Sequence, residues 1–254
     1  MNQVLIHSDF REFRNQTRHL NPSQVDYKRE LVDQAFQHCL ELAMGREILL
    51  PAFNYDYTKT KIFDTDKDLP QVGRLPREAM IRPGWKRSLT PVYSILSNKA
   101  ETPQYLEPFS ENSIFADLVS NGGEIILVGV GCERLTFLHH VEHVFGVPYR
   151  YEKTFDGEII QGKKSSSVTV KFHVRPIELQ VEYDFKRIES YLLDIAAVSY
   201  VGNKTLKVEP KLTMDSLLTA LNEDFSFFLT ENSKVKVSEK LAQLGRPMTI
   251  EDFE

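Results

Sequence analysis

The sequence predicts an α/β fold, with a mostly parallel central sheet flanked by helices in three layers and an antiparallel hairpin region in the second half. Three observations support this prediction. Short apolar runs at residues 4–7, 47–53 and 124–130 are typical of strands that are buried on both faces. Stretches with apolar residues at helical spacing lie between these runs. After Pro148 the pattern changes to long alternating stretches, which favour antiparallel pairs.

The first half of the chain alternates strands with helices. After the strand at residues 4–7, the polar Ser8 and Asp9 are suited to cap a helix that begins near Phe10. A longer helix is expected next, and Gly45 is a natural end for it. The expected elements are the helix at 23–44, the strand at 47–53, a polar loop at 54–72, a helix at 75–81, a strand at 89–96, a helix at 113–119, the strand at 124–130 and a helix at 133–145.

The second half of the sequence predicts a hairpin followed by helices. The stretch 149–160 contains Asp156-Gly157 as a hairpin turn signal, and an alternating strand at 165–174 follows it. The later segments are a helix at 184–197, a strand or loop at 198–210, a helix at 214–229 and a polar tail. We expect one domain over residues 1–254, with a core at about 1–150 and an antiparallel and helical extension at about 151–254.

Composition excludes several classes of partner. The formal net charge is -5, and Lys and Arg are not clustered, so neither nucleic acid nor an anionic membrane is an expected partner. The N-terminus lacks the apolar stretch of a signal peptide, and no run of about eighteen apolar residues occurs. Cys39 and Cys132 form no disulfide framework. We therefore expect a soluble, cytoplasmic protein; the sequence leaves open whether it forms a homo-oligomer.

The segment 136–143 carries a candidate for proton transfer. On a helix, His139 lies beside Glu142 and His143, whereas His140 points elsewhere. An imidazole that is oriented by a carboxylate can accept the proton that an amine loses when it is acylated. Because this helix follows a buried strand through Gly131, its first turn is expected at the carboxyl edge of the sheet, where α/β folds bind ligands.

Two other interpretations of this segment remain open. The histidines could be ordinary, partly buried helix residues. Alternatively, His139-x-x-Glu142-His143 fits the pattern of zinc peptidases in which two His bind the metal and Glu activates water.

Several separated blocks of the first 150 or so residues occur in a specific order. They are Ile6-His7-Ser8, residues 49–53, Gly73-Arg74-Leu75-Pro76, residues 82–88, residues 126–131, and Thr136-x-Leu138-His139-x-x-Glu142. In this order they resemble the aminoglycoside N-3-acetyltransferase family. One block departs from the family pattern R-S-x-H-P, because Thr90 stands where the family usually has His.

The resemblance implies an acyltransferase that uses acetyl-coenzyme A as co-substrate and needs no metal. His139 would be the general base, Glu142 its orienting partner, and an amino sugar the acceptor in a direct transfer. Residues 147–151 resemble members associated with bacterial surface-polysaccharide (O-antigen) sugars, which favours a nucleotide-linked amino sugar. The alternatives are an aminoglycoside as substrate, a zinc hydrolase, and an inactive carbohydrate-binding relative.

The remaining site residues follow from the chemistry of the two substrates. The phosphates of coenzyme A need amides, hydroxyls and a few cations, and the candidates are His7, Ser8, Arg87, Ser88, Thr90 and Thr136. Ser8 could equally be a plain helix cap, and Arg87 a surface ion pair.

A cationic amino sugar should meet carboxylates and aromatic faces, which Asn54, Tyr55 and Asp56 offer at the end of a strand. An Asp that caps a loop is the simpler interpretation of Asp56. For Cys132 we expect a packing role and no covalent intermediate.

Overall fold

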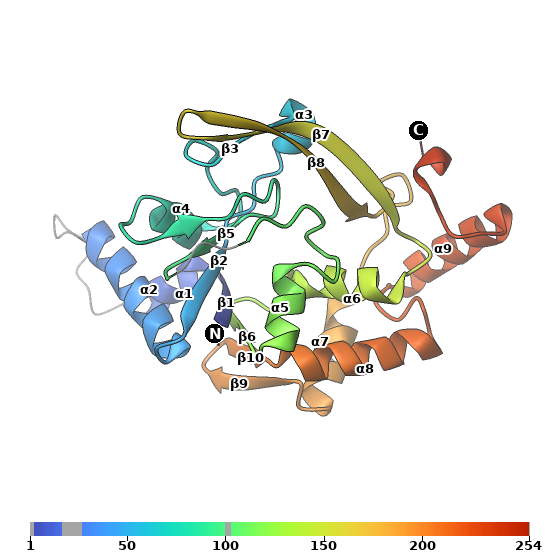
Figure 1. The fold of residues 1–254 in the computed structure, drawn as a ribbon. Coiled ribbons are helices and arrows are strands. Elements are labelled where there is room, and N and C mark those ends of the chain that lie inside the picture. The colour runs from blue at the N-terminus through green and yellow to red at the C-terminus, as the bar shows by residue number, and fades with distance from the viewer. Residues whose placement is uncertain (1–2, 17–26, 100–102, 254) are drawn as a thin grey trace.

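The computed structural model describes residues 3–16, 27–99 and 103–253, and a seven-stranded sheet lies at its centre (Figure 1). The strand order is β4-β5-β2-β1-β6-β10-β9. Their bounds are β1 Gln3–Ser8, β2 Glu47–Pro51, β4 Lys86–Arg87, β5 Ile95–Ser97, β6 Glu124–Val128, β9 Val198–Gly202 and β10 Thr205–Val208. β1 pairs with β2 and β6 in parallel, whereas the other pairs are antiparallel. The parallel strands therefore form the middle of a mixed sheet.

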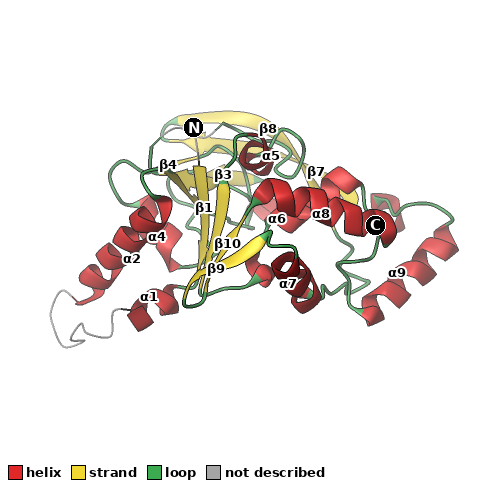
Figure 2. Cartoon of the chain, turned by 90° about the horizontal axis from the view of Figure 1, so that it is seen from below, coloured by secondary structure: helices red, strands yellow, loops and turns green. Residues whose placement is uncertain are grey.

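Helices cover both faces of this sheet, as the α/β prediction requires (Figures 1 and 2). On one face, Ile6 and Leu50 pack with α1 (Phe10–Gln16), α2 (Tyr27–Ala43) and α4 (Arg74–Met80). On the other, Leu5 and Leu49 pack with α5 (Ile114–Ser120), α6 (Phe137–Phe145), α7 (Phe185–Asp194) and α8 (Pro210–Glu223). Neighbouring residues of a strand point to opposite faces, so runs such as residues 48–50 are apolar throughout. No helix in the described ranges is both long enough and apolar enough to cross a membrane.

A second sheet contains β3 (Ile62–Asp64), β7 (Tyr151–Gln161) and β8 (Lys164–Val174), which arch over the top of the molecule in Figure 1. The hairpin is confirmed, but its expected turn at Asp156-Gly157 is wrong. Both residues pair within the hairpin, and Gly162, with φ 60°, lies at the turn. Gly157 is required for another reason: a Cβ there would lie 2.2 Å from the carbonyl oxygen of Lys61.

Other differences from the sequence-based expectation are local. The predicted loop at 54–72 contains α3 (Tyr57–Thr60) and β3, and only the end of the predicted strand at 89–96 is extended, as β5. The predicted helix at 133–145 divides into the short η1 (Cys132–Arg134) and α6. The predicted polar tail contains α9 (Glu231–Leu244), which Thr230 caps, and the short η2 (Ile250–Asp252). Residues 23–26 of the first long helix lie outside the described residues.

Candidate active site

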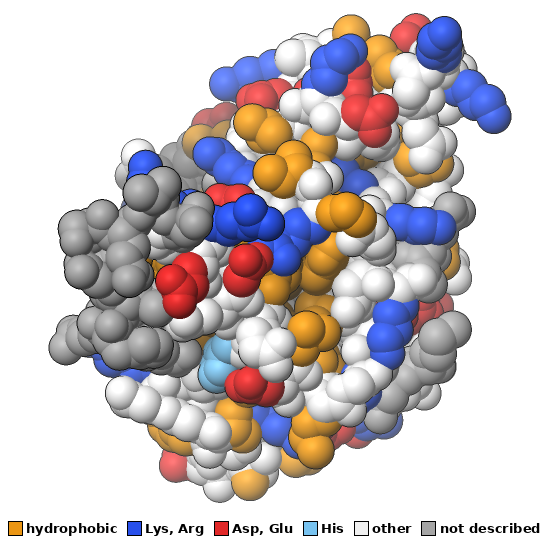
Figure 3. Space-filling model, turned by 90° about the vertical axis from the view of Figure 1, so that its left-hand side faces the viewer, with side chains coloured by type: hydrophobic (Ala, Val, Ile, Leu, Met, Phe, Trp, Pro, Cys, Tyr) orange, Lys and Arg blue, Asp and Glu red, His pale blue; other side chains and the backbone are white. Residues whose placement is uncertain are grey.

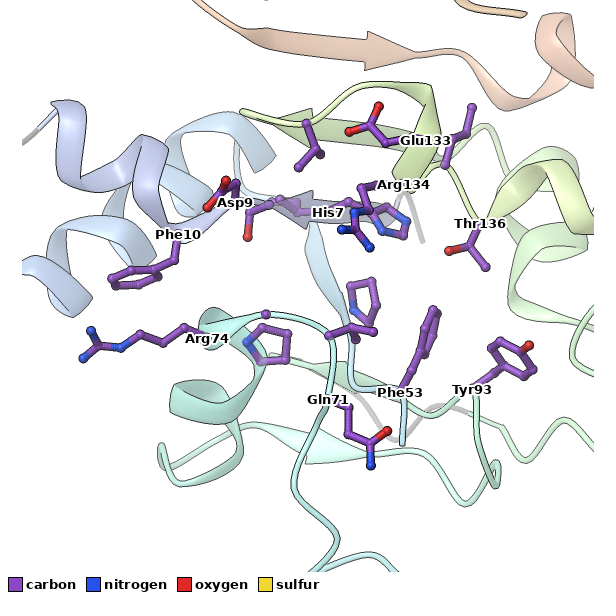
Figure 4. Close-up of a pocket in the computed structure, with 18 of the residues that line it drawn as sticks. His7, Asp9, Phe10, Phe53, Gln71, Arg74, Tyr93, Glu133, Arg134 and Thr136 are labelled. Atoms are coloured by element: carbon purple, nitrogen blue, oxygen red, sulfur yellow. The ribbon is translucent and has the colours of Figure 1, made fainter. Parts of the chain in front are cut away.

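A cavity of about 500 Å³ lies where the parallel strands β1, β2 and β6 end. His7 and Ser8 from the end of β1 line it, together with Thr136 and His139 from the start of α6. Figure 4 shows His7 and Thr136 around this opening, together with Arg134, which also lines the cavity. The carboxyl edge of parallel strands is the usual ligand-binding edge of α/β folds, and the cavity lies there.

His139 occupies the first turn of α6, and its side chain is 30% exposed. Its Nδ1 lies 3.1 Å from Oε2 of Glu142, which is three residues further along the helix. The two side chains meet because residues three apart share a helix face. Since Nδ1 is engaged by the carboxylate, Nε2 is the ring nitrogen that remains for a substrate.

The Glu142 carboxylate is fully buried, yet each of its oxygens has partners. Its Oε1 accepts hydrogen bonds from the hydroxyls of Tyr149, at 3.0 Å, and Tyr183, at 2.7 Å. Its Oε2 lies 2.9 Å from Nε of Arg150, so the two side chains form an ion pair. The Nε–H group of Arg150 is not aligned for a hydrogen bond to this oxygen. Burial alone would raise the pKa of Glu142, but the charge of Arg150, the contact with His139 and the hydrogen bond from Tyr183 lower it to about 2. Glu142 is therefore ionised at neutral pH.

The protonation state of His139 results from opposing influences. Burial lowers the pKa of the imidazole, Arg150 lowers it further, and the contact with Glu142 raises it. The balance is a pKa below the ordinary value of 6.5. At neutral pH the imidazole is consequently unprotonated and able to accept a proton.

A second cavity, of about 600 Å³, adjoins the first at the imidazole of His139. The two cavities share Tyr93, Glu133, His139, Tyr183 and Phe185. The second one is also lined by Arg150, His173, Arg175 and Glu182. The site can therefore present one imidazole to two ligands, as an acyl transfer between two substrates requires.

Three arginines line the first cavity, and they differ in how they are paired. Arg11 forms an ion pair with Asp9, and Arg74 forms one with Glu78. Arg134 has no ion pair within the described ranges, and it lies beside the ring of His7 (Figure 4). Arg134 is thus the cation of this cavity that is free to meet a phosphate. On the face of the molecule that Figure 3 shows, positive and negative side chains are interspersed.

His7 is 8% exposed, and its Nε2 is buried without a hydrogen-bond partner in the part of the chain that the structure describes. Burial, together with the charge of Arg134, lowers the pKa of His7 to about 4. His7 is therefore neutral at physiological pH and can contact a ligand as a hydrogen-bonding group without charge.

The structure brings together only some of the residues that the sequence selects for coenzyme A. His7, Ser8 and Thr136 line the first cavity. Arg87, Ser88 and Thr90 do not line either cavity, because their side chains hydrogen-bond within the protein. Arg87 Nη2 donates to the Ala52 carbonyl at 2.8 Å, Ser88 Oγ accepts from the Ile95 amide at 2.9 Å, and Thr90 Oγ1 accepts from the Tyr105 amide at 3.0 Å.

Of the three residues selected for the acceptor, Tyr55 alone lines one of these two cavities. Asn54 Oδ1 accepts a hydrogen bond from the Asp56 amide at 2.9 Å, and its Nδ2 donates to the Leu69 carbonyl at 2.9 Å. Asn54 therefore builds the turn, and Asp56 is exposed outside both cavities. This is the local capping geometry that Asn favours after a strand.

The side chains of the zinc interpretation do not converge. His143 Nε2 lies 3.5 Å from Glu152, and the Glu142 carboxylate is taken up by Arg150 and two tyrosines. Among the described residues, no group of three or more His, Cys, Asp or Glu is placed to hold a metal ion. Cys132 is fully buried, and burial, with Glu189 nearby, raises the pKa of its thiol.

Sequence reasoning missed Arg134 and Arg150. Arg134 lies inside the predicted helix region, and its position at the edge of the cavity follows only from the break between η1 and α6. Arg150 follows α6 in the chain, and its side chain contacts Glu142 only because of the path that the chain takes after this helix. No local spacing in the sequence therefore predicts the contact. The only signal in the sequence is an arginine flanked by two tyrosines, which is not specific.

Comparison with known proteins places this geometry in a family. Among solved structures, the chain is similar to a binary complex of AAC-IIIb with CoASH (18% identity, TM-score 0.67, covering 87% of this chain and 90% of that one). It is also similar to aminoglycoside acetyltransferase AAC(3)-Xa (18% identity, TM-score 0.67, 87% of each chain). A third is the YokD protein from Bacillus subtilis (15% identity, TM-score 0.62, 88% of this chain and 92% of that one).

At these identities the similarity shows the fold. No curated protein matches the sequence. A family model described as aminoglycoside 3-N-acetyltransferase matches residues 46–211, which is more than half of the chain and includes His139, Glu142 and Arg150. The chain belongs to the aminoglycoside 3-N-acetyltransferase family and is an acetyl-coenzyme A-dependent N-acetyltransferase.

Proposed function

We propose that His139 is the general base in a direct transfer of the acetyl group from acetyl-coenzyme A to the amine of an amino sugar. One observation carries this proposal: a neutral imidazole, held by the ionised Glu142, lies where two cavities meet. One cavity would hold the thioester, and the other would deliver the amine.

The reaction follows from this placement. The free amine attacks the thioester carbonyl, and Nε2 of His139 takes the proton that the nitrogen releases. Glu142 stabilises the imidazolium that forms. When the C–S bond breaks, the imidazolium returns the proton to the departing sulfur, which leaves as the free thiol of coenzyme A. The substrate ammonium gives its first proton to solvent, so one proton is released for each amide formed.

We assign the coenzyme to the first cavity. Arg134 would pair with a phosphate, because it is the lining arginine without a described ion-pair partner. Ser8 and Thr136 offer hydroxyls, and His7 offers its unpartnered Nε2. Arg87, Ser88 and Thr90 are left out of the proposed site, since their side chains serve the loop around β4 and β5.

For the acceptor we favour an amino sugar that also carries an anionic group, such as a nucleotide-linked sugar for surface-polysaccharide biosynthesis. The second cavity contains Arg175, which donates to the Val181 carbonyl at 2.8 Å and has no ion pair in the described ranges. A guanidinium binds phosphate well. Tyr55 is left out of the acceptor site, because it lines the first cavity, which we assign to the coenzyme, and does not line the second. Asn54 and Asp56 are left out, because neither lines a cavity.

An aminoglycoside is the second candidate acceptor. It is favoured by the family, and by a complex of aminoglycoside acetyltransferase AAC(3)-IVa with a gentamicin, which has 20% identity to this chain. The exposed Glu133 and Glu182 of the second cavity could pair with its ammonium groups.

Thiol release from acetyl-coenzyme A in the presence of each amine tests both the proposed reaction and the proposed acceptor. We expect turnover with a nucleotide-linked amino sugar to exceed turnover with gentamicin, and cells that express the chain to stay sensitive to the drug. Faster turnover with gentamicin, together with drug resistance of the cells, would show that the acceptor is an aminoglycoside. Absence of turnover with every amine would contradict the proposed function itself.

A further inference from the structure

Two opposite charges face the same nitrogen of the catalytic imidazole. Nδ1 of His139 lies 3.1 Å from Oε2 of Glu142 and 3.0 Å from Nη2 of Arg150. A neutral imidazole carries one proton, so Nδ1 cannot donate to the carboxylate and accept from the guanidinium at once. With the proton on Nδ1, as general-base action by Nε2 requires, Nδ1 donates to Glu142, and Arg150 acts on His139 through its positive charge alone.

Arg150 cannot move away from this contact. Its side chain is 4% exposed. Nη1 donates to the carbonyl of His173 at 2.8 Å, Nη2 donates to the hydroxyl of Tyr183, and Nε lies 2.9 Å from Glu142. The guanidinium is therefore a fixed charge, anchored by β8 on one side and by the segment before α7 on the other.

The two charges have different effects on the two forms of His139. A carboxylate alone beside a buried imidazole would favour the imidazolium, which is useless as a base. With Arg150 in place, the imidazole lies beside a neutral ion pair and keeps its proton-accepting form. Arg150 neutralises the charge of Glu142 but leaves Oε2 of Glu142 in contact with Nδ1 of His139. Glu142 therefore still accepts the hydrogen bond that fixes the ring.

Other ionisable groups around the imidazole do not replace Arg150. Arg175 acts in the same direction, but from an exposed position just after β8. Tyr183 and Tyr149 are neutral, since burial raises the pKa of both hydroxyls, and burial lowers the pKa of His173 to about 3. Of the other ionisable groups that line the two cavities, Tyr93 is neutral because burial raises its pKa, and Glu133, Arg134 and Glu182 are exposed.

We propose that Arg150 is a positioning residue for acetyl transfer, which locks Glu142 against Nδ1 of His139 and keeps the imidazole unprotonated at neutral pH. This inference rests on the proposed role of His139 as the base. It adds a third member to the His-Glu pair, contributed by a segment outside the helix that carries the pair.

The test compares Arg150→Met with Glu142→Gln in the pH dependence of kcat/KM. Arg150→Met leaves the Glu142 carboxylate beside His139 without its counter-charge, which favours the imidazolium. The acid limb of the profile, where kcat/KM falls because His139 becomes protonated, therefore moves to higher pH by roughly one unit or more. Glu142→Gln leaves the guanidinium alone, so the acid limb moves to lower pH while kcat falls. The substrate amine is the same throughout and contributes equally to every profile. A role confined to structure would lower the rate at every pH and leave the limb in place.

Three further measurements keep the test decisive if a single variant folds poorly. The double variant Arg150→Met/Glu142→Gln removes both charges, and its acid limb should lie between those of the two single variants. Arg150→Lys keeps the charge without the planar fork, so it should preserve the limb and lower kcat. NMR titration of the His139 ring in these variants gives the same order of pKa values without any substrate.

The outcomes separate this inference from the proposed function. An acid limb and a ring titration of Arg150→Met that coincide with the wild type, or of the double variant that coincide with Glu142→Gln, would overturn the role of Arg150, even if His139 remained essential. Full turnover by His139→Asn would instead remove the base on which the inference rests.

Discussion

The Glu142 carboxylate illustrates how a buried charge is kept ionised in this protein. Two tyrosine hydroxyls donate to one oxygen, while the other oxygen faces Arg150 and His139. An ionised carboxylate without such partners would be strongly destabilising at a fully buried position. The same carboxylate contacts Nδ1 of His139, so under the proposed function stability and catalysis depend on the same group at the residue scale.

Cys132 provides a test of direct transfer. Its thiol is fully buried, and its pKa is raised, so it is a poor nucleophile. We expect Cys132→Ala to keep thiol release within a factor of about three of the wild type and to lower the free energy of unfolding by about 1 kcal/mol. Steady-state kinetics and urea unfolding measure both effects.

Cys39→Ala is the matched control, because Cys39 is equally buried but lies in α2, in the core on the other face of the sheet from Cys132. If Cys132→Ala abolished turnover while Cys39→Ala did not, a covalent acetyl-cysteine intermediate would replace direct transfer.

The sequence predicted residue contacts where they are local. His139 and Glu142 were predicted to meet because they are three apart on one helix. The turn residue Asn54 was assigned to the acceptor, because a polar residue after a strand suits either a turn or a ligand. Arg150 was missed, since its contact with His139 depends on where the chain goes after α6.

At the scale of elements, the close approach of β3 to β7 depends on the absence of a side chain at Gly157. A Cβ there would lie 2.2 Å from the backbone oxygen of Lys61 and 2.7 Å from the hydroxyl of Tyr57. Backbone cannot give way as a flexible side chain does. The small sheet therefore holds the segment after β2 in place through this contact.

Gly157→Ala should accordingly lower the free energy of unfolding by more than about 2 kcal/mol, as overpacking a well-packed contact does. Gly162→Ala is the control, since a Cβ there meets nothing within 4 Å, although φ is 60°. That strain costs roughly 1–2 kcal/mol. Urea unfolding compares the two variants. An equal or smaller loss for Gly157→Ala would contradict the close approach.

Elements were predicted well where burial leaves a periodic or continuous apolar pattern. β2 and β6 were predicted because both faces are covered by helices, which makes their residues apolar throughout. α9 was missed, because Ser233 and Val237 are its buried residues and the rest of its surface is polar. β3 is three residues long, too short to show a pattern.

At the scale of the whole molecule, the architecture combines a mixed sheet, two helical layers and a separate small sheet, and it is shared with structures of less than 20% identity. The sequence predicted this class from the alternation of strands and helices. It could not predict that β5 and β10 are antiparallel to the central strands, since pairing direction depends on long-range connections.

Two buried histidines make the stability of the molecule depend on pH. Burial lowers the pKa of His7 to about 4 and that of His173 to about 3, whereas both groups have ordinary values of 6.5 when exposed. The unfolded chain therefore binds more protons below pH 6.5. The stabilisation is fully present above that pH and is lost as the pH falls toward the folded pKa values.

Urea unfolding at pH 7.5 and pH 5.0 should show a decrease of about 2 kcal/mol for each of these histidines. In His7→Gln the decrease should be smaller by about 2 kcal/mol. Below about pH 4.5, Glu142 adds to the loss, because its folded pKa of about 2 keeps it ionised while the unfolded chain is protonated. A free energy of unfolding that is the same at pH 7.5 and pH 5.0 would show that these rings are not buried in their neutral form.

The role of His139 is tested most directly by thiol release from acetyl-coenzyme A in His139→Asn. The account predicts a fall in kcat of roughly 10²–10⁴-fold with coenzyme binding retained, because the proton acceptor is lost and the fold is not. His143→Asn, on the same helix but outside both cavities, should keep its rate. Turnover by His139→Asn at the wild-type rate would contradict the account.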